Sequence, residues 1–426
     1  MNQNSYPLPS VVGGYGSKDQ FERERVENGQ WVFWEERVEA IIKGDYCSVK
    51  PLHLELSPTY LCNFACPWCS CRSAREEWSD VDIFNRPDSS AKTVSSEEKL
   101  LNIVKELAKE NVDIQWVGGE PTMHPSFYKS AKLASELGLK QCLFTNGSIL
   151  SREQASQLFE ANFVFIRVSL DAVDQEVHQK HHGYNKRMNY GKKVLDNIRG
   201  LIIEKQKHNY KTLIGLSFVI DDVNLADLPA SMDFVESICS EFGEKSIDYI
   251  IIRPAYEFYS SQVILSPETV TYIEKMFCGN GKYRQRLEEF GVKVITPSAS
   301  FERAQNSNNM EDNLCLASGW FSELNPNGDM MVCSDRYGNP EDIIGNLAQT
   351  TISDIWSSEK RQETLRKVDA RKCFRRECPV NGRGYHLNDI FNNIEAMRLE
   401  GKMPLVEKWI EDLRAILPEP KHSFFL

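Results

Sequence analysis

The sequence has no long hydrophobic run and no excess of basic residues. No stretch approaches the roughly eighteen consecutive apolar residues that a membrane-spanning helix needs. The N-terminal segment MNQNSYPLPSVVGGYGSKDQ has neither a basic start nor an apolar centre, so we expect no signal peptide. The formal net charge of −11 argues against a nucleic-acid surface or an anionic membrane as a partner. We therefore expect a cytoplasmic protein that binds neither nucleic acid nor membranes.

Disulfide bonds are not expected either, because the cytoplasm is a reducing compartment. The twelve cysteines are then thiols or metal ligands, and their placement is more informative than their number. Four are isolated and typical of small buried hydrophobic residues: Cys47, Cys142, Cys239 and Cys278. The other eight form two groups, one from Cys62 to Cys71 and one from Cys315 to Cys378.

Apolar strands and amphipathic helices alternate from residue 52 to about residue 260. The 426 residues exceed one compact core, so we expect one large and one smaller domain. Six apolar runs predict strands: 52–57, 112–119, 140–147, 163–171, 212–220 and 246–254. Because these runs are almost continuously apolar, they favour a parallel sheet buried on both faces. The prediction is an α/β fold, a partial (β/α)6 barrel similar to a TIM barrel.

Two helices between these strands begin with a capping-box pattern, Ser95 with Glu98 and Ser151 with Gln154. After residue 300 the pattern changes to a polar linker, then to short strands with Gly and Pro turns, and finally to helices. We expect four segments: an N-terminal extension (1–50), the barrel (51–300), a small cysteine-rich domain (301–385) and a C-terminal helical segment (386–426).

Polar motifs follow all six predicted strands. In chain order they are Cys62–Cys69, Gly118–Pro121, Thr145–Gly147, Ser169–Ala172, Asp221–Asp222 and Arg253–Glu257. The active site of a parallel barrel forms at the carboxyl ends of its strands. The sequence therefore predicts that these motifs meet on one rim.

The first cysteine group has the spacing Cys62-x3-Cys66-x2-Cys69. A structural zinc site needs four ligands. Three thiolates on one short loop leave one position open, as in an iron–sulfur cluster with one free iron. A zinc knuckle and chance clustering are the alternatives that the spacing leaves open.

This stretch resembles the signature of the radical S-adenosylmethionine (SAM) superfamily. The resemblance covers about residues 52–260 and includes Trp68 before the last cysteine, GGEP after the second strand and SLDA after the fourth. It implies a 4Fe–4S cluster on Cys62, Cys66 and Cys69 whose open iron binds SAM. One electron then cleaves SAM and yields a 5′-deoxyadenosyl radical, which abstracts a hydrogen atom from the substrate.

The resemblance also implies a SAM-binding set. The two glycines of GGEP would let the backbone approach the amino group of SAM. Many members carry an arginine that contacts SAM where this chain has His182, so His182, Lys186 or Arg187 would take over its role. Cys71 is expected to be a packed thiol beside the cluster, and Thr145 to lie next to the set. The set is Trp68, Gly118, Gly119, Glu120, Pro121, Asn146, Ser169, Asp171 and His182.

The second cysteine group resembles the SPASM and twitch extensions of radical SAM enzymes, which hold auxiliary iron–sulfur clusters. Its four cysteines, Cys315, Cys333, Cys373 and Cys378, are enough to ligate one 4Fe–4S cluster. Structural zinc is the alternative. With the SAM-binding cluster, this makes two 4Fe–4S clusters. A fully ligated cluster has no open iron and would conduct electrons, which favours a two-electron oxidation.

We therefore expect a radical SAM oxidoreductase that dehydrogenates a small polar metabolite, such as a sugar or an aminocyclitol. Arg253, Tyr256 and Glu257 would hold or deprotonate this substrate, and flavodoxin or ferredoxin would donate electrons. A peptide-modifying maturase ranks second, because residues 1–50 look too short for a leader-binding domain. Redox-neutral epimerisation or dehydration also stays open. The non-enzyme alternative is an iron–sulfur or zinc scaffold or electron carrier.

Overall fold

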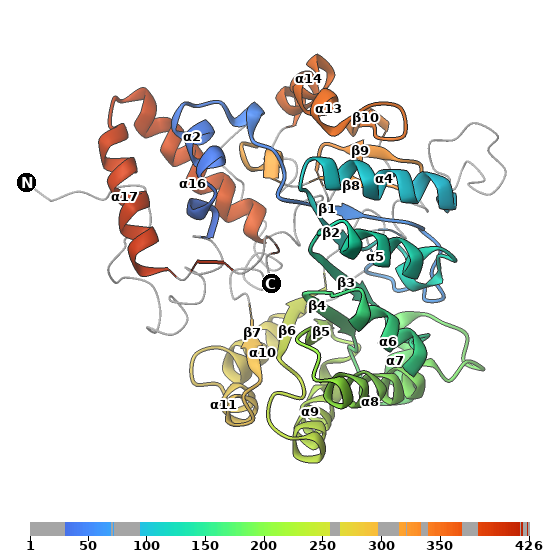
Figure 1. Ribbon diagram of the computed structural model, residues 1–426. Helices are drawn as coiled ribbons and strands as arrows, with labels where there is room; N and C mark the ends of the chain where they lie inside the picture. The colour runs from blue at the N-terminus through green and yellow to red at the C-terminus, as the bar shows by residue number, and fades with distance from the viewer. Residues whose placement is uncertain are drawn as a thin grey trace, which may run out of the picture.

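The computed structural model describes residues 30–69, 71, 94–255, 265–296, 315–320, 322–333, 340–368, 382–417, 419–420 and 424. Within them, one sheet runs in the order β10-β9-β8-β1-β2-β3-β4-β5-β6-β7 (Figure 1). The strands from β1 to β7 are all parallel to their neighbours. They are β1 (His53–Leu56), β2 (Asp113–Trp116), β3 (Gln141–Thr145), β4 (Phe165–Ser169), β5 (Leu213–Ile220), β6 (Tyr249–Pro254) and β7 (Lys293–Ile295). Edge strands β7 and β10 do not pair with each other among the described residues, so the sheet is open, as a partial barrel requires.

Helices follow the parallel strands and cover the outside of the sheet (Figure 1). They are α4 (Glu97–Lys109), α5 (Phe127–Glu136), α6 (Arg152–Glu160), α7 (Gln175–His182), α8 (Tyr190–His208), α9 (Leu228–Phe242), α10 (Pro267–Phe277) and α11 (Lys282–Glu289). The capping box of Ser151 with Gln154 is confirmed at α6. The prediction for Ser95 is wrong by one residue: Ser96 caps α4 by accepting a hydrogen bond from the Lys99 amide.

The expected cysteine-rich segment adds strands to the barrel sheet. Strand β8 (Glu323–Leu324) lies parallel to β1, and β9 (Asp329–Met331) and β10 (Ile343–Asn346) follow it antiparallel. The buried carboxylate of Glu323 accepts hydrogen bonds from Ser57 Oγ at 2.7 Å and Tyr60 Oη at 2.9 Å. Strand β8 therefore supports the chain where it leaves β1 and enters the cysteine loop. Helices α13 (Ile352–Ser357) and α14 (Glu359–Lys367) come after β10.

The two ends of the described chain pack together beside the barrel. Helix α2 (Glu35–Ile42) shares a hydrophobic cluster with α16 (Gly382–Leu399) and α17 (Met403–Ile416). The rings of Trp31 and Phe391 meet edge to face at 5.3 Å, and Arg414 Nε donates to the carbonyl of Val32 at 2.6 Å. The expected N-terminal and C-terminal segments thus form one body (Figure 1). The 3-10 helices are η1 (Gln30–Phe33), η2 (Tyr46–Ser48), η3 (Pro121–Met123), η4 (Leu225–Asp227), η5 (Ala317–Trp320) and η6 (Pro340–Asp342).

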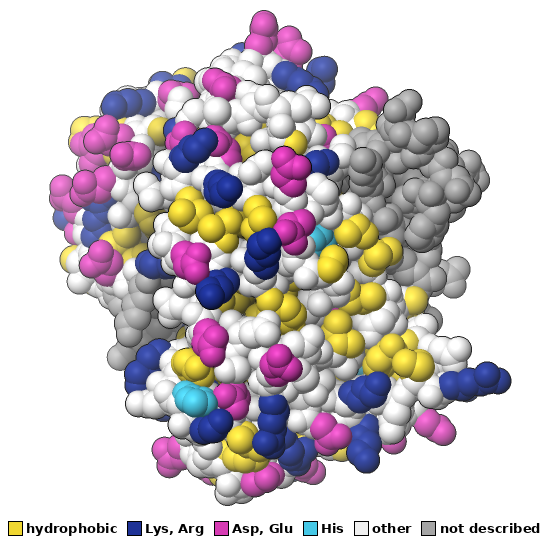
Figure 2. All heavy atoms as spheres, turned by 45° about the vertical axis from the view of Figure 1, so that its right-hand side comes forward, with side chains coloured by type: hydrophobic (Ala, Val, Ile, Leu, Met, Phe, Trp, Pro, Cys, Tyr) yellow, Lys and Arg dark blue, Asp and Glu magenta, His cyan; other side chains and the backbone are white. Residues whose placement is uncertain are grey.

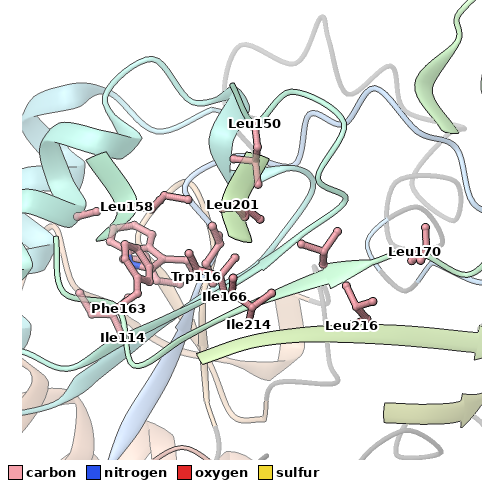
Figure 3. Close-up of a cluster of buried hydrophobic side chains, with 14 of the residues drawn as sticks. Ile114, Trp116, Leu150, Leu158, Phe163, Ile166, Leu170, Leu201, Ile214 and Leu216 are labelled. Atoms are coloured by element: carbon pink, nitrogen blue, oxygen red, sulfur yellow. The ribbon is translucent and has the colours of Figure 1, made fainter. Parts of the chain in front are cut away.

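The main core lies between the sheet and its helices. Side chains of β2, β4 and β5 meet those of α6 and α8 there, as Figure 3 shows for Trp116, Ile166 and Leu201. Trp116 Nε1 donates to the buried amide oxygen of Gln141 at 2.8 Å, so its polar atom is satisfied inside the core. A second, smaller apolar cluster closes the inside of the barrel and contains Cys142, Phe165, Tyr249, Ile251, Ile295 and Phe424. We call this cluster the barrel plug.

On the face drawn in Figure 2, acidic and basic side chains are interspersed with small hydrophobic areas. None of the helices in the described parts of the chain combines the length and the hydropathy that crossing a membrane would take.

Candidate active site

A cavity of about 280 Å3 lies where the parallel strands end. The cysteine loop, residues 61–69, forms one side, and side chains of the barrel strands form the other. Among the predicted site residues, those that line the cavity are Cys62, Cys66, Trp68, Cys69, Gly118, Gly119, Asn146, Ser169, His182 and Arg253. The structure thus brings motifs from five strand ends and the end of α7 to one place.

The cysteine loop is docked on the C-terminus of α7. The Ala65 amide donates to the carbonyl of His182 at 2.9 Å, which satisfies one of the carbonyls that a helix end leaves open. Gly183 ends α7 with a φ of 65°, and a Cβ there would lie 2.5 Å from the Ala65 carbonyl oxygen. Only glycine fits both conditions. The Phe64 ring then packs over His182, with ring centroids 4.8 Å apart.

The three thiols of the loop are close enough to influence one another. Burial raises the pKa of the Cys66 thiol well above its usual value, and the neighbouring Cys69 and Cys62 raise it further. Thiolates at these positions therefore need a nearby positive charge, which iron supplies. No three His, Cys, Asp or Glu side chains in the described ranges form a group that could hold a single metal ion. A cubane cluster fits the arrangement, because each thiolate would bind a different iron atom.

His182 contacts the cysteine loop through its side chain as well. Its Nδ1 lies 3.1 Å from Cys66 Sγ, and its Nε2 lies 3.4 Å from Asp171 Oδ2. Asp171 is fully buried, and its Oδ1 accepts a hydrogen bond from the Val219 amide at 2.6 Å. Burial raises the pKa of Asp171 to about 6 and lowers that of His182 well below its usual value. Asp171, proposed from the sequence as a SAM ligand, does not line the cavity and lies behind His182, on the side away from Cys66.

The two glycines after β2 allow the chain to pass close to the start of the cysteine loop. A Cβ on Gly118 would lie 2.7 Å from the Thr59 carbonyl oxygen, and one on Gly119 would lie 2.2 Å from that of Leu61. The Gly119 amide donates to the carbonyl of Thr59 at 2.9 Å. Both glycines line the cavity, yet their most direct structural role is this backbone approach.

Glu120 is a buried hydrogen-bond acceptor behind the cavity. Its carboxylate accepts from Thr122 Oγ1 at 2.5 Å, Thr145 Oγ1 at 2.8 Å and the Asn146 amide at 2.7 Å. Burial raises its pKa. Neither Glu120 nor Pro121 lines the cavity, so the geometry gives Glu120 a positioning role: it joins the ends of β2 and β3. Asn146, positioned in this way, points its Nδ2 at Cys62 Sγ over 3.7 Å.

Only some of the remaining predicted residues lie at the cavity. Arg253 lines the cavity and its Nη2 lies 3.5 Å from Ser217 Oγ. Lys186 and Arg187, the two alternatives to His182, are exposed. Cys71 lines the cavity and donates to the carbonyl of Gly118 at 3.1 Å. Tyr256 and Glu257 lie outside the described residues.

The second cysteine group is described only in part. Cys315 and Cys333 are partly buried against the main core, while Cys373 and Cys378 lie outside the described residues. Sequence reasoning missed three polar residues of the barrel strands that line the cavity: Glu55, Gln115 and Arg167. The available signal was a charged or amide side chain inside an otherwise apolar strand.

Two family models match parts of the chain. Residues 56–235 match the model of the Radical SAM superfamily, and residues 315–379 match that of an iron–sulfur cluster-binding domain, SPASM. The chain therefore contains a radical SAM domain and carries a SPASM domain towards its C-terminus. The first domain implies SAM and a 4Fe–4S cluster, and the second implies auxiliary iron–sulfur binding.

Individual relatives are more distant. Fe-coproporphyrin III synthase of Methanosarcina barkeri is 29% identical over 42% of this chain and 39% of its own length. PqqA peptide cyclase of Bradyrhizobium diazoefficiens is 30% identical over 32% of either chain. The chain thus spans between about a third and two fifths of these relatives. AdoMet-dependent heme synthase of Oleidesulfovibrio alaskensis is 23% identical over 70% of this chain and 72% of its own.

Among solved structures, SuiB of Streptococcus suis has a TM-score of 0.55 at 15% identity. The match covers 83% of this chain and 75% of SuiB. At this identity the likeness concerns the fold alone.

Proposed function

We propose that this chain is a radical SAM oxidoreductase that removes two hydrogen atoms from a small polar metabolite, such as a sugar or an aminocyclitol. The observation that carries the proposal is that three thiols of one loop and polar side chains of the barrel strands face the same cavity. In the proposal, Cys62, Cys66 and Cys69 hold a 4Fe–4S cluster. Cys315, Cys333, Cys373 and Cys378 hold one auxiliary cluster.

When bound, these cofactors supply the 5′-deoxyadenosyl radical that takes one hydrogen atom and an acceptor for the electron that the substrate gives up. Side chains of the protein would supply what else the reaction needs, a base and groups that orient the substrate. A basic side chain must accept the hydroxyl proton, so that hydrogen atom, proton and electron together make up the oxidation of an alcohol to a carbonyl. Arg253, which lines the cavity, would orient the substrate. Tyr256 and Glu257 remain our sequence-based choices for holding and deprotonating it, and flavodoxin or ferredoxin our choice of electron donor.

The SAM-binding part of the proposal rests on the residues around the cysteine loop. Trp68, Gly118, Gly119, Asn146 and Ser169 line the cavity beside the thiols and would contact SAM. Glu120 and Asp171 would act behind them, and His182, which also lines the cavity, would fix the cysteine loop.

The test is anaerobic reconstitution with iron and sulfide, followed by incubation with SAM and dithionite. The proposal predicts release of 5′-deoxyadenosine by the wild-type protein and none by Cys66→Ala. A reconstituted wild-type protein that leaves SAM intact would favour an iron–sulfur or zinc scaffold or electron carrier. With candidate substrates, a product that lacks two hydrogen atoms supports dehydrogenation, whereas an unchanged mass indicates epimerisation.

A peptide substrate is the second candidate. The relative named PqqA peptide cyclase supports it, as does the fold likeness to SuiB, which has been solved with its precursor peptide SuiA. The same assay with peptide and metabolite libraries separates the two candidates.

A further inference from the structure

Arg167 lies inside the barrel, one layer below the rim. It is two residues before Ser169 on β4, so both side chains leave the strand on the same face. Phe165, two residues earlier on that face, belongs to the barrel plug. Arg167 is 5% exposed and lines the cavity, and its guanidinium carbon lies 3.5 Å from the centre of the Phe144 ring. The guanidinium therefore forms part of the polar floor of the cavity, between the plug and the cysteine loop.

This buried cation forms no ion pair within the described residues, and the carboxylate that acts on it, Glu55, does so without direct contact. Among the described residues, Arg167 makes no hydrogen bond and no ion pair; its stacking on Phe144 is the contact that the structure records. Burial lowers its pKa, and Tyr249, Cys142 and Glu55 act on it only through longer-range electrostatics. No nitrogen of the Arg167 guanidinium is among the fully buried polar atoms that lack a partner, so the group reaches the open volume of the cavity, where a ligand can bind it.

The other buried arginines show what a structural arginine looks like here. Arg361 also stacks on an aromatic ring, that of Trp356 at 4.1 Å, but it donates to the carbonyls of Cys47 and Trp356. Arg284 Nε donates to the carbonyl of Phe277 at 2.6 Å. Each holds two parts of the chain together, whereas Arg167 faces open volume.

The charges around the cavity favour an anion. Its lining contains two guanidinium groups, Arg167 and Arg253, and one carboxylate, Glu55. Gln115 Nε2 donates to Glu55 Oε1 at 2.9 Å, so part of the acceptor capacity of this carboxylate is used.

We infer that Arg167 binds an anionic group of the substrate, a carboxylate or a phosphate, and so orients the rest of that molecule towards the cysteine loop. The inference rests on the proposed function and narrows its substrate class to acidic metabolites. Arginine suits this task because its planar fork of donors matches both oxyanions. With its anionic group bound at the floor of the cavity, the substrate would place its carbon atoms between Arg167 and the cysteine loop.

The first test needs no substrate. Arg167→Met and Arg361→Met are made in the full chain, reconstituted anaerobically and compared by thermal unfolding. Removal of an unpaired buried cation should leave Tm unchanged or raised, whereas Arg361→Met should lower it because two backbone carbonyls lose their donor. A fall in Tm for Arg167→Met that matches the fall for Arg361→Met would show a structural arginine and overturn the inference.

The second test uses formate and inorganic phosphate as probes. At least one should raise the Tm of the wild-type protein saturably, and Arg167→Met should weaken that binding about tenfold or more. Equal responses in both proteins, or none in either, would overturn the inference. SAM also carries a carboxylate, so its binding is measured by calorimetry. If Arg167→Met weakens SAM binding by a similar factor, Arg167 serves SAM and the assignment to substrate fails. None of these readouts requires 5′-deoxyadenosine formation, so they are independent of the proposed function.

Discussion

The contact between His182 and Cys66 predicts a change in the reduction potential of the cluster. A cysteine bound to iron is a thiolate and has no proton to donate, so the nitrogen 3.1 Å away, His182 Nδ1, must be the donor. Hydrogen bonds to cluster sulfurs are one of the factors that set the potential. They favour the reduced cluster because it carries one more negative charge. Loss of this bond should therefore make the potential more negative.

Two substitutions separate the hydrogen bond from the packing of the ring. The amide nitrogen of an asparagine can occupy the place of Nδ1, whereas that of a glutamine reaches the place of Nε2, on the side of Asp171. His182→Asn should therefore keep the donor to sulfur, and His182→Gln should lose it. His178→Asn is the control, because His178 packs on the same rings but its Nδ1 faces Tyr184 Oη at 3.0 Å.

The size of the effect follows from the kind of bond. A hydrogen bond to a charged acceptor contributes about 1.5–3 kcal/mol. If about half of this favours the reduced form, His182→Gln should shift the potential by about 30–60 mV, since tenfold in a one-electron equilibrium is about 59 mV.

The assay is a redox titration followed by electron paramagnetic resonance. The SAM-binding cluster is recognised as the signal that changes when SAM is added. The expected order is a potential near wild type for His182→Asn and His178→Asn and a more negative one for His182→Gln. Equal potentials for His182→Asn and His182→Gln, at full iron content, would refute the role of the hydrogen bond.

Three further predictions concern the clusters and the rim. Two cubane clusters imply about eight iron atoms per chain after reconstitution, and replacing Cys62, Cys66 and Cys69 with Ala should halve that content; stoichiometric zinc beside a single cluster would contradict the auxiliary-cluster proposal. Glu120→Gln should lower the free energy of unfolding by about 1–3 kcal/mol in urea titrations, because an NH2 group then faces a donor of the buried network; no loss would contradict its positioning role. Cys333→Ala, where soluble, should lower the ratio of product to 5′-deoxyadenosine, and an unchanged ratio would remove the electron-acceptor role of the auxiliary cluster.

The barrel and its rim could be predicted because both depend on patterns of residues that are close together in the sequence. Continuous apolar runs located the six inner strands, and the motifs after five of them located the cavity. The sixth motif, Asp221–Asp222 after β5, does not line it. Strand β8 could not be predicted, because two residues carry no periodicity and its place is set by pairing with β1. The packing of α2 on α16 likewise depends on contacts between residues far apart in sequence.

Within the site, residue type alone did not separate ligands from the residues that position them. Asp171 and Glu120 follow strands as expected, yet both carboxylates are buried and bonded behind the cavity. Arg167 was overlooked because it interrupts an apolar strand, where its direction depends on the pleat.

The central claim is that Cys62, Cys66 and Cys69 hold a cluster with an open iron that binds SAM. It is tested most directly by electron–nuclear double resonance on the reduced, reconstituted protein with SAM labelled with 15N in its amino group and 17O in its carboxylate. Both labels should couple to the spin of the cluster, and the couplings should disappear in Cys66→Ala. Bound SAM whose labels show no coupling in the wild-type protein would contradict the claim.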